Sequence, residues 1–424
     1  MHANRICLVG SGHVSFNPRL LKEADALDAA GHHVRVVTVN AHAASWQVDQ
    51  ALVSSRRWKL DALDAQRRGP GRSLWLLGAL RQQLYRKSRW LRNRQRGLER
   101  ALFRYADEFS RLVAAKQADL YIAHSLEALL SAVAAARRWR AKVGIDFEDF
   151  YSGIQTVGSG SPLERELVAE VEAKYIGCCD YQTAASPGVA AAIASRYQCA
   201  SPPVILNVFP LENRPQQPYS PDDSAPIRLY WFSQVIGRHR GLEDAVHAIA
   251  KLPRGSVELH LRGYYGGDGS EYLQKLIVES HIHPQAVHFH AYERTDRMVR
   301  LAAHYDVGLA LEVPISENRL ICMKDLCTNK VFTYLLAGLA LAATAVDAGG
   351  DIYEGAGFSY RQGDSEALAA GLKRWLDDRP ALNRAKAKAW QLGETRYNWD
   401  VEKKKLLLLV DEVLKDRPLS SQAA

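Results

Sequence analysis

Short apolar strands alternate with amphipathic helices along almost the whole chain, and this alternation restricts the fold more than any other feature. The first example runs from the strand RICLVG at 5–10, through a helix, to the strand HVRVVTV at 33–39. Asn17 is the expected N-cap of that helix, Pro18 its first residue and Gly31 its end. Strands that alternate with helices in this way form parallel sheets covered by helices on both faces.

A proline-rich segment interrupts this alternation once, between residues 209 and 226. It contains five prolines and no apolar periodicity, so its composition predicts a linker. The alternation restarts with the strand IRLYWFS at 227–233. We therefore predict an α/β chain in which a first domain, residues 1–208, and a second domain from residue 227 are both doubly wound and Rossmann-like. Their ligands are expected at the carboxyl ends of the strands, in a cleft between the two domains.

Composition is typical of a globular enzyme from a reducing compartment. The chain has 424 residues, of which 47% are hydrophobic, enough for two cores. Its six cysteines include no CxxC pair, which argues against a zinc framework or a disulfide scaffold and favours the cytoplasm. The apolar stretch at the N-terminus is too brief for a signal peptide, and no run reaches the roughly 20 apolar residues that a membrane span needs.

The net charge of +8 comes from one segment. Residues 56–100 contain fourteen lysines and arginines against three acidic residues, so the remainder of the chain is slightly acidic. Within this segment, one helical face can carry Leu77, Leu80, Leu84 and Leu91. A basic amphipathic helix is typical of a protein that lies on an anionic membrane, and the alternatives are a solvated basic helix or one whose apolar face packs on the sheet. No nucleic-acid-binding motif accompanies the basic residues, so nucleic acid is not an expected partner.

Lys330 stands in the first turn of an expected helix, where a positive charge is unfavourable by roughly 0.3–1 kcal/mol. This helix starts at Thr328 or Asn329 with free backbone N–H groups, which together with Lys330 would bind an anion such as a diphosphate. Arg238 and Arg240 precede another helix start in the same domain. Two such loops predict a nucleotide with a pyrophosphate, whereas a solvated lysine is the alternative for Lys330.

Several histidines are candidate functional residues. His124 stands at the end of an expected strand and His13 lies in the first loop, so both are expected near the ligand, with a structural role as the alternative. The stretch HIHPQAVHFH at 281–290 contains four histidines. However, His288 and His290 alternate along an expected strand, and no cysteine or carboxylate cluster is nearby in the sequence. We therefore assign no metal site.

A longer motif, NKVFTYLLAGLALAAT at 329–344, resembles the NKLFEYLAAGLPVVAS signature of GT-B glycosyltransferases of the group 1, family 4-like superfamily. Further segments that look like the family's motifs occur in the same order, among them 118–149 and 181–197. The resemblance therefore covers nearly the whole chain. It implies a GT-B fold with a nucleotide-sugar-binding domain at 227–396, and a final helix with a tail, 397–424, that crosses back to the acceptor-binding first domain.

The resemblance also implies roles for individual residues. Arg240 and Lys330 would bind the donor diphosphate and stabilise the leaving group, so that no metal or other cofactor is obligatory. Gly12 would let the first loop approach the donor closely, and Glu312 or Glu317 would contact its sugar. The donor-binding residues predicted in these ways are Gly12, Arg238, Arg240, Glu312, Asn329, Lys330 and Thr333.

Two positions depart from the family's pattern. Thr333 replaces the glutamate that usually holds the donor ribose, and with Asp325 it changes the E-x7-E pattern to D-x7-T, so a retaining outcome is not implied. Glu148 replaces the histidine that normally reaches the reacting sugar, and it would act as a base or hydrogen-bond acceptor. The candidate catalytic residues are therefore Glu148, His124 and His13.

Together these features predict a glycosyltransferase of the hexosyltransferase type. It would transfer a sugar from a nucleotide-diphosphate sugar to a saccharide, lipid-linked saccharide or small-molecule acceptor in polysaccharide or glycoconjugate biosynthesis. We expect it in the cytoplasm, peripheral on the inner face of the cell membrane through residues 56–100. A nucleotide-sugar epimerase or hydrolase on the same scaffold is one alternative, and a catalytically degenerate binding subunit, suggested by Thr333 and Glu148, is another.

Overall fold

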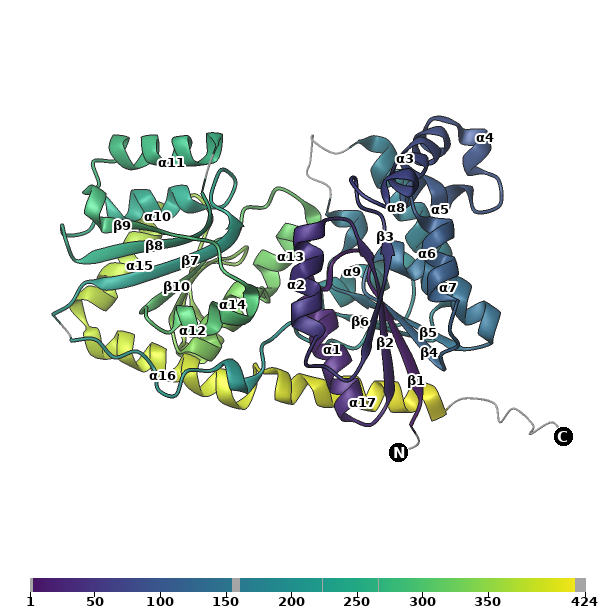
Figure 1. Cartoon of the computed structure of the whole chain (residues 1–424). Helices are drawn as coiled ribbons and strands as arrows, with labels where there is room; N and C mark the ends of the chain where they lie inside the picture. Colours follow the sequence, from purple (N-terminus) through teal and green to yellow (C-terminus); the bar gives the residue numbers. More distant parts are fainter. Residues whose placement is uncertain (1–2, 155–160, 223, 266, 416–424) are drawn as a thin grey trace. The chain divides into compact units, whose positions relative to one another are not determined.

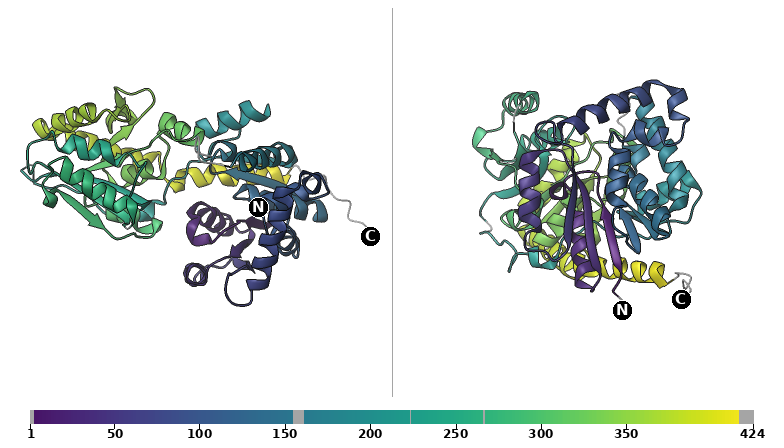
Figure 2. Two further views of the ribbon diagram at one scale, coloured as in Figure 1. Left: turned by 90° about the horizontal axis from the view of Figure 1, so that it is seen from above. Right: turned by 45° about the vertical axis from the view of Figure 1, so that its right-hand side comes forward.

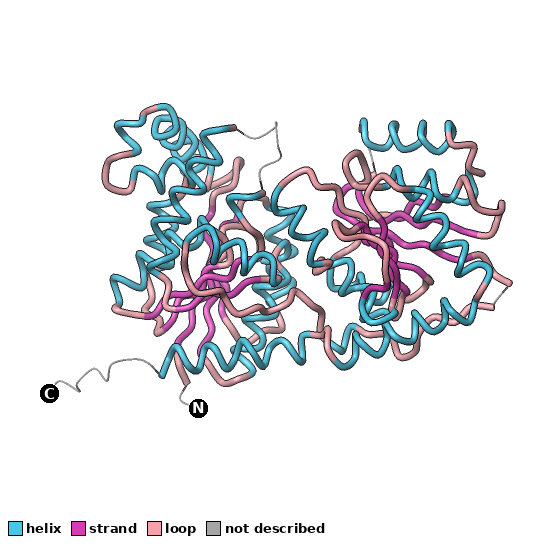
Figure 3. Tube along the Cα trace, turned by 180° about the vertical axis from the view of Figure 1, so that it is seen from behind, coloured by secondary structure: helices cyan, strands magenta, loops and turns pink. Residues whose placement is uncertain are grey.

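Two compact units make up the chain, the first from residues 1–205 and 403–424 and the second from residues 206–402. The computed structural model describes residues 3–154, 161–222, 224–265 and 267–415. In each unit a largely parallel sheet lies between helices on both of its faces (Figures 1 and 3). The predicted α/β class with two doubly wound, Rossmann-like domains is confirmed.

The first unit contains a six-stranded, all-parallel sheet with the order β3-β2-β1-β4-β5-β6. Its strands are β1 (Arg5–Val9), β2 (His33–Asn40), β3 (Lys59–Asp64), β4 (Leu120–Ala123), β5 (Lys142–Phe147) and β6 (Tyr181–Ala184). The order reverses between β1 and β4. In a doubly wound sheet, ligands bind where the order reverses, beyond the carboxyl ends of the strands. The loops after β1 and β4 are therefore the ones to inspect.

The helices of the first unit begin where the sequence places good capping residues. They are α1 (Pro18–Ala29), α2 (Ala43–Val53), α3 (Arg72–Lys87), α4 (Arg89–Arg92), α5 (Gly97–Leu102), α6 (Ala106–Val113), α7 (Leu126–Trp139), α8 (Pro162–Tyr175) and α9 (Pro187–Tyr197), with short 3-10 turns at Val14–Phe16, Tyr151–Gly153 and Ile176–Cys178. Asn17 caps α1 by accepting a hydrogen bond from the backbone N–H of Leu20 at 2.9 Å, as predicted. Ser186 caps α9 in the same way.

The second unit repeats the same winding. Its sheet has the order β12-β13-β11-β10-β7-β8-β9, in which only the short β12 is antiparallel, and the order reverses between β7 and β10. Figure 2 shows the sheets from two further directions. The strands are β7 (Ile227–Val235), β8 (Val257–Tyr264), β9 (Val287–His290), β10 (Val307–Ala310), β11 (Ala340–Thr344), β12 (Asp351–Ile352) and β13 (Gly357–Tyr360).

The helices of this unit connect successive strands of its sheet. They are α10 (Leu242–Ile249), α11 (Asp268–Glu279), α12 (Met298–Ala302), α13 (Glu317–Asp325), α14 (Asn329–Ala337), α15 (Ser365–Asp377) and α16 (Arg379–Thr395), with 3-10 turns at Leu211–Asn213, Pro284–Ala286, Thr295–Arg297 and Tyr353–Gly355. The last helix, α17 (Trp399–Lys415), starts in the second unit and belongs to the first from Lys403 onward.

The region around the predicted linker makes specific contacts. Just before it, the stretch PVILNV at 203–208 forms an isolated bridge between Val204 and Ala184. The predicted linker, 209–226, lies within the second unit and contacts it. There the guanidinium of Arg214 lies 3.5 Å above the ring of Trp390 on α16 and donates a hydrogen bond to its carbonyl. The described residues of the predicted linker, 209–222 and 224–226, are therefore part of the second unit.

The basic segment 56–100 folds as β3, α3, α4 and the start of α5. Strand β3 was not expected, because charged residues interrupt its apolar positions and it pairs only with β2 at the edge of the sheet. Among the described residues, no helix combines the length and the apolar character needed to cross a bilayer.

Candidate active site

In the second unit, two loops meet where the strand order reverses. One follows β7 and carries Arg238, Arg240 and Gly241, and the other follows β10 and carries Leu311 and Glu312. Gly241 has a left-handed backbone with φ of 71°, and a Cβ added there would lie 3.1 Å from the Cβ of Leu311. Because the loops approach this closely, glycine is needed at the start of α10 and Arg240 comes near Glu312.

Glu312 joins two cations from separate helix starts. The Nζ of Lys330, in the first turn of α14, donates to Glu312 Oε1 at 2.9 Å, and Nη1 of Arg319, in the first turn of α13, donates to Oε2 at 2.8 Å. Glu312 is almost fully buried, and its backbone N–H donates to the hydroxyl of Thr344 at 2.8 Å. The carboxylate therefore compensates the unfavourable position of Lys330, which is not a solvated lysine.

The charges of this cluster do not balance. Burial by itself would raise the pKa of Glu312, but the positive charges of Lys330 and Arg319 lower it, so the carboxylate is ionised. The pKa of Arg240 is lowered by burial and by the nearby Arg319, and Glu312 opposes this change. Three cations thus share one carboxylate. This excess of positive charge at a helix start is suited to an anion that carries more than one negative charge.

The remaining residues that were predicted to bind the donor differ in how much of their side chains is exposed to solvent. Thr328 is the N-cap of α14, so the exposed Asn329 is its first residue. Arg238 is exposed, and its guanidinium lies 3.8 Å above the ring of Tyr272. Thr333 differs, because its side chain is fully buried and its hydroxyl donates to the carbonyl of Asn329 at 2.8 Å. The structure therefore does not offer Thr333 to a ribose, and this assignment is corrected.

In the first unit, the loop after β1 is held in place by His13. The Nδ1 of His13 is 2.6 Å from the carboxylate of Asp49 on α2, and its Nε2 accepts hydrogen bonds from the backbone N–H groups of Ala41 and His42, each at 3.2 Å. Since Nε2 accepts, the proton lies on Nδ1 and is donated to Asp49. Both ring nitrogens are used and the ring is buried, so His13 has the structural role and its assignment as a catalytic residue is corrected.

The same loop contains the glycines that were expected to approach a donor. At Gly10 an added Cβ would lie 2.9 Å from Cδ1 of Leu20, whereas at Gly12 no atom lies within 4 Å of such a Cβ. The side chain of Ser11 accepts a hydrogen bond from the hydroxyl of Ser125, the N-cap of α7, at 2.9 Å. Gly10 is therefore required by packing on α1, while the space beside Gly12 is open.

His124, at the end of β4, lies among three carboxylates. Its Nε2 is 3.3 Å from Glu23, and its Nδ1 is 3.6 Å from Asp146 and 3.4 Å from Glu148. Burial would lower the pKa of His124, but the charge of Glu23 and the hydrogen bond to Glu148 raise it to about 10. An imidazolium at neutral pH cannot act as a base. Its side chain is also fully buried. His124 is thus a positioning residue, and its assignment as a catalytic residue is corrected.

Arg19 on α1 completes this buried group. Its guanidinium forms two hydrogen bonds with Asp146, one of them 2.6 Å from Nη2 to Oδ1, and donates to the carbonyl of Ile205 at 2.7 Å. Asp146 also accepts from the hydroxyl of Thr183 at 2.7 Å. Charge from Arg19 is matched by Asp146 and Glu23, both of which are buried. This balanced network fixes α1 against the ends of β4, β5 and β6.

Glu148 is the member of the group that reaches solvent. Its carboxylate accepts from Nδ2 of Asn17 at 2.6 Å and from Nδ1 of His124, while about a quarter of the side chain is exposed. Two donors hold one carboxylate oxygen, Oε1, and neither uses Oε2. Glu148 is therefore a fixed carboxylate at the carboxyl edge of the sheet, as a hydrogen-bond acceptor or base requires.

Comparison with known proteins connects the first of these two clusters to a family model. Residues 17–211 match the model of the glycosyl transferase 4-like domain. This match covers a little under half of the chain. The predicted resemblance to group 1 glycosyltransferases is thereby confirmed. No curated protein matches the chain.

Solved structures resemble the chain over almost its full length. Sucrose-phosphate synthase from Thermosynechococcus elongatus has 16% identity and a TM-score of 0.68, with 98% of this chain and 100% of that chain covered. A glycosyltransferase from Rickettsia africae has 13% identity and a TM-score of 0.66, with coverage of 98% and 100%. Anabaena Alr3699/HepE in complex with UDP-glucose has 13% identity and a TM-score of 0.66, with coverage of 96% and 100%. These similarities confirm the GT-B fold.

Sequence reasoning missed two residues of the two clusters. Arg319 was overlooked although it shows the same feature that drew attention to Lys330, a cation in the first turn of a helix. Asn17 was identified as a helix cap, but its second role, as a donor to Glu148, depends on a contact across 131 residues of sequence. By contrast, Lys330, Arg240 and Glu312 were selected individually, and the structure brings them together.

Proposed function

We propose that this glycosyltransferase uses a nucleotide-diphosphate sugar as donor and binds its diphosphate with the second-unit cluster. The observation that carries the proposal is the excess of positive charge around Glu312, made by Lys330, Arg319 and Arg240 where the strand order reverses. The UDP and UDP-glucose complexes named for Alr3699/HepE make uridine nucleotides the first donors to test.

The proposed chemistry follows from where charge develops. As the bond between the anomeric carbon and the diphosphate breaks, its electron pair stays on the leaving phosphate oxygen. Lys330, Arg240 and the N–H groups at the start of α14 stabilise that charge, so no metal or other cofactor is required by the proposal. Asn329 and Arg238 border the same site, and Glu312 keeps Lys330 and Arg319 oriented. We also propose that Glu312 or Glu317 contacts the donor sugar.

On the acceptor side, we assign the reacting role to Glu148. An acceptor hydroxyl that forms the new bond to the anomeric carbon must lose its proton, and Glu148 is the exposed carboxylate of its cluster. His124 and Asn17 hold it by hydrogen bonds. Removal of a general base lowers turnover typically by 10²–10⁴-fold, so Glu148→Gln should reduce turnover by at least about 100-fold while donor affinity stays unchanged.

A nucleotide-release assay separates transfer from the two alternatives. The full chain is incubated with UDP-glucose and other nucleotide sugars, with and without candidate saccharide and lipid-linked acceptors. Release of UDP that depends on an acceptor supports transfer. Release without any acceptor supports a hydrolase or, if the sugar is recovered as its epimer, an epimerase. Binding of the nucleotide sugar without turnover, across the donor and acceptor panel, supports a degenerate binding subunit.

We further propose that the acceptor lies at an anionic membrane surface, on the inner face of the cell membrane, to which α3 attaches. This helix exposes Leu76, Leu77, Leu80 and Leu84, which are 49–66% accessible. Its opposite side contacts the protein, where Gly78 lies against Tyr105 and Gln82 donates to two backbone carbonyls. The leucine face is thus directed away from the core, contrary to the alternative in which it packs on the sheet.

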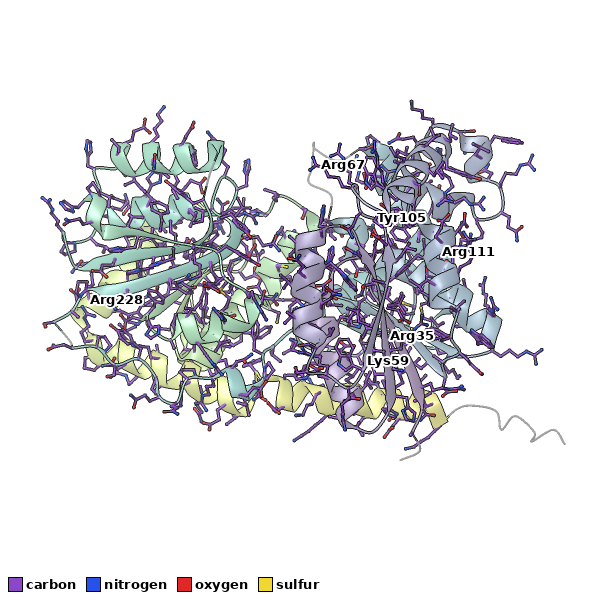
Figure 4. All side chains as sticks on the ribbon, viewed as in Figure 1. Arg35, Lys59, Arg67, Tyr105, Arg111 and Arg228 are labelled. Carbon is purple, nitrogen blue, oxygen red and sulfur yellow. The ribbon has the colours of Figure 1, made fainter. Side chains whose placement is uncertain are left out.

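Basic residues next to this leucine face favour anionic lipid. Arg67, Arg68 and Arg72, with Trp75 and Leu76, line a cavity of about 610 Å³. The guanidinium of Arg67, labelled in Figure 4, lies 5.1 Å from the centre of the Trp75 ring. Arginines beside exposed leucines and tryptophan match the requirements of a lipid surface with negatively charged headgroups.

Vesicle sedimentation tests the membrane proposal. The full chain should bind vesicles that contain anionic phospholipid, bind neutral vesicles weakly, and dissociate as salt screens the charges. Leu77→Glu combined with Leu80→Glu should abolish binding, whereas Leu408→Glu, a matched change of another exposed leucine, should have no effect. Equal binding to neutral and anionic vesicles, or no effect of the α3 substitutions, would contradict the proposal.

A further inference from the structure

Three histidines and a glutamate gather on two strands at the edge of the second unit's sheet, away from the loops described above. Strands β8 and β9 pair in parallel, with His260 opposite His288 and Arg262 opposite His290. Residues two apart on a strand face the same side, so Glu258 and His260 share a face with both histidines of β9. The rings of His260 and His288 stack with centres 4.4 Å apart and planes 10° apart.

Hydrogen bonds connect three members of this cluster. Nε2 of His260 is 3.2 Å from Oε2 of Glu258, and Nδ1 of His260 is 3.1 Å from Nε2 of His290. A carboxylate can only accept, so the Nε2–H of His260 donates to Glu258, and His290 donates to Nδ1 of His260. Nε2 of His288 is buried and has no hydrogen-bond partner within the described part of the chain. A buried polar atom without a partner indicates a missing one.

We propose that Glu258, His260 and His288 bind a divalent transition-metal ion of the Zn²⁺ class. Each residue offers one ligand atom, and these atoms all lie within 4.8 Å of one another. Two imidazole nitrogens and one carboxylate oxygen form a common three-ligand set for zinc, with water in the fourth position. Glu258 and His288 are partly exposed, so water can reach that position. The ion would join β8 to the edge strand β9.

Protons balance when such an ion binds. Nε2 of His260 would lose its proton and bind the ion, while the ring would carry its one proton on Nδ1 and donate it in a hydrogen bond to Nε2 of His290. His290 would in turn carry its proton on its own Nδ1. His290 thereby becomes the hydrogen-bond acceptor that fixes a ligating histidine, as is usual around metal sites. Arg228, labelled in Figure 4, opposes the ion, because its guanidinium lies 3.4 Å from Glu258. The side chain of Arg228 is 42% exposed, which leaves it room to move away.

A second trio, made of one histidine and two carboxylates, lacks this capacity. Glu23, His124 and Asp146 also present ligand atoms within 4.8 Å of one another. However, the guanidinium of Arg19 already occupies both oxygens of Asp146. The charge of Arg19 therefore already stands where a metal ion would bind in this second trio, and the proposal is confined to the β8–β9 cluster.

Metal titration of the full chain tests the site. After treatment with EDTA and dialysis, Zn²⁺ is titrated by calorimetry and Co²⁺ by visible absorption. We expect one ion per chain and a cobalt spectrum without the thiolate charge-transfer band that binding to cysteine would give. Loss of an outer hydrogen-bond partner typically costs 10–100-fold in metal affinity, so His290→Gln should weaken binding by that factor and His288→Gln or Glu258→Gln by at least about 100-fold.

A matched variant separates this site from adventitious histidine binding. His281 is exposed in the loop before β9, and its φ of 55° suits asparagine, so His281→Asn should keep the affinity of the natural chain. Melting curves recorded in EDTA establish that each variant is folded. Zinc binding that is absent, or that is as strong in His288→Gln and Glu258→Gln as in His281→Asn, would overturn the proposal.

Discussion

The two charge clusters at the carboxyl edges of the two sheets are built from similar residues but differ in balance and exposure. In the first unit, Arg19 and His124 are fully buried and are matched by Glu23 and Asp146. In the second unit, Glu312 alone faces several cations, of which Arg319 is 38% exposed. Both clusters stand where the order of their sheet reverses or directly beside that point.

This difference distinguishes charged residues that stabilise the fold from charged residues that bind a ligand. In a buried network the positive and negative charges compensate one another, so the network holds elements together and attracts no further ion. A partly exposed group with excess charge is satisfied only when a counter-ion arrives. The first cluster offers a ligand just one exposed side chain, Glu148, whereas the second offers a concentration of positive charge. The following predictions test this distinction, in order of decreasing expected effect.

The largest effect is expected for Asp146→Asn. The substitution removes the carboxylate that binds both sides of the buried Arg19 guanidinium and leaves only Glu23, 3.6 Å away, as its counter-charge. Breaking a buried pair costs about 3–5 kcal/mol of the free energy of unfolding. Urea denaturation followed by tryptophan fluorescence measures the loss. As a control, Asp377→Asn breaks an exposed pair with Lys373, for which at most about 1 kcal/mol is expected. Equal losses in the two variants would remove the structural role of the first cluster.

The second prediction concerns diphosphate affinity. Lys330→Ala and Arg240→Ala should each weaken UDP binding by about 1.5–3 kcal/mol, the range for hydrogen bonds to charged groups. Calorimetry gives the affinities. Lys324→Ala, which changes an exposed lysine on α13, should bind UDP as the natural chain does. The second cluster would lose its assignment if neither substitution altered the affinity, or if all three altered it alike.

The third prediction is a pH dependence of stability. Burial opposes the charge of His124, but its carboxylate neighbours raise its folded pKa to about 10, above the usual 6.5. A raised pKa means that this group's contribution is complete below pH 6.5, declines as pH rises further and is lost above about pH 10. Stability should therefore fall between those values in the natural chain, and less steeply in His124→Gln. Parallel pH profiles for the two proteins would show that His124 is not an imidazolium.

The smallest effect is expected for Glu312→Gln. Its carboxylate repels an incoming diphosphate and neutralises part of the charge of Lys330 and Arg319, so its removal should strengthen UDP binding by several-fold. Competition binding against a fluorescent nucleotide resolves a change of this size. Weaker UDP binding in the variant would mean that Glu312 acts mainly by orienting the two cations.

Sequence reasoning was accurate where local chemistry decides the structure. Caps such as Asn17 and Ser186 fixed helix starts, and strand alternation predicted both sheets, because each depends on residues close together in the chain. Lys330 was also found locally, as a cation at an unfavourable helix position. Its partner Glu312 was selected separately, since only the register of β10 and β11 brings the two together.

The errors came from contacts that no local pattern encodes. His13 and His124 stand at loop positions typical of catalytic residues, yet partners far along the chain, Asp49 and Glu23, bury and bind them. The histidines of β9 were given no metal because no carboxylate stands near them in the sequence. Parallel pairing with β8 supplies Glu258. The contact of Thr333 with the donor ribose was inferred from the family resemblance. The hydroxyl of Thr333 instead donates a hydrogen bond to a carbonyl within α14.

The first unit is built from two stretches of chain that are far apart in the sequence. This arrangement affects how the unit folds during synthesis. Leu406 and Val410 of α17 are fully buried parts of this unit, although the whole second unit is translated before them. Domains generally fold in the order in which the ribosome releases them. Here the domain made first is finished last, so its nascent form exposes an apolar surface until the final turns of α17 emerge. Chaperone binding to stalled nascent chains should end only when residue 410 has left the exit tunnel.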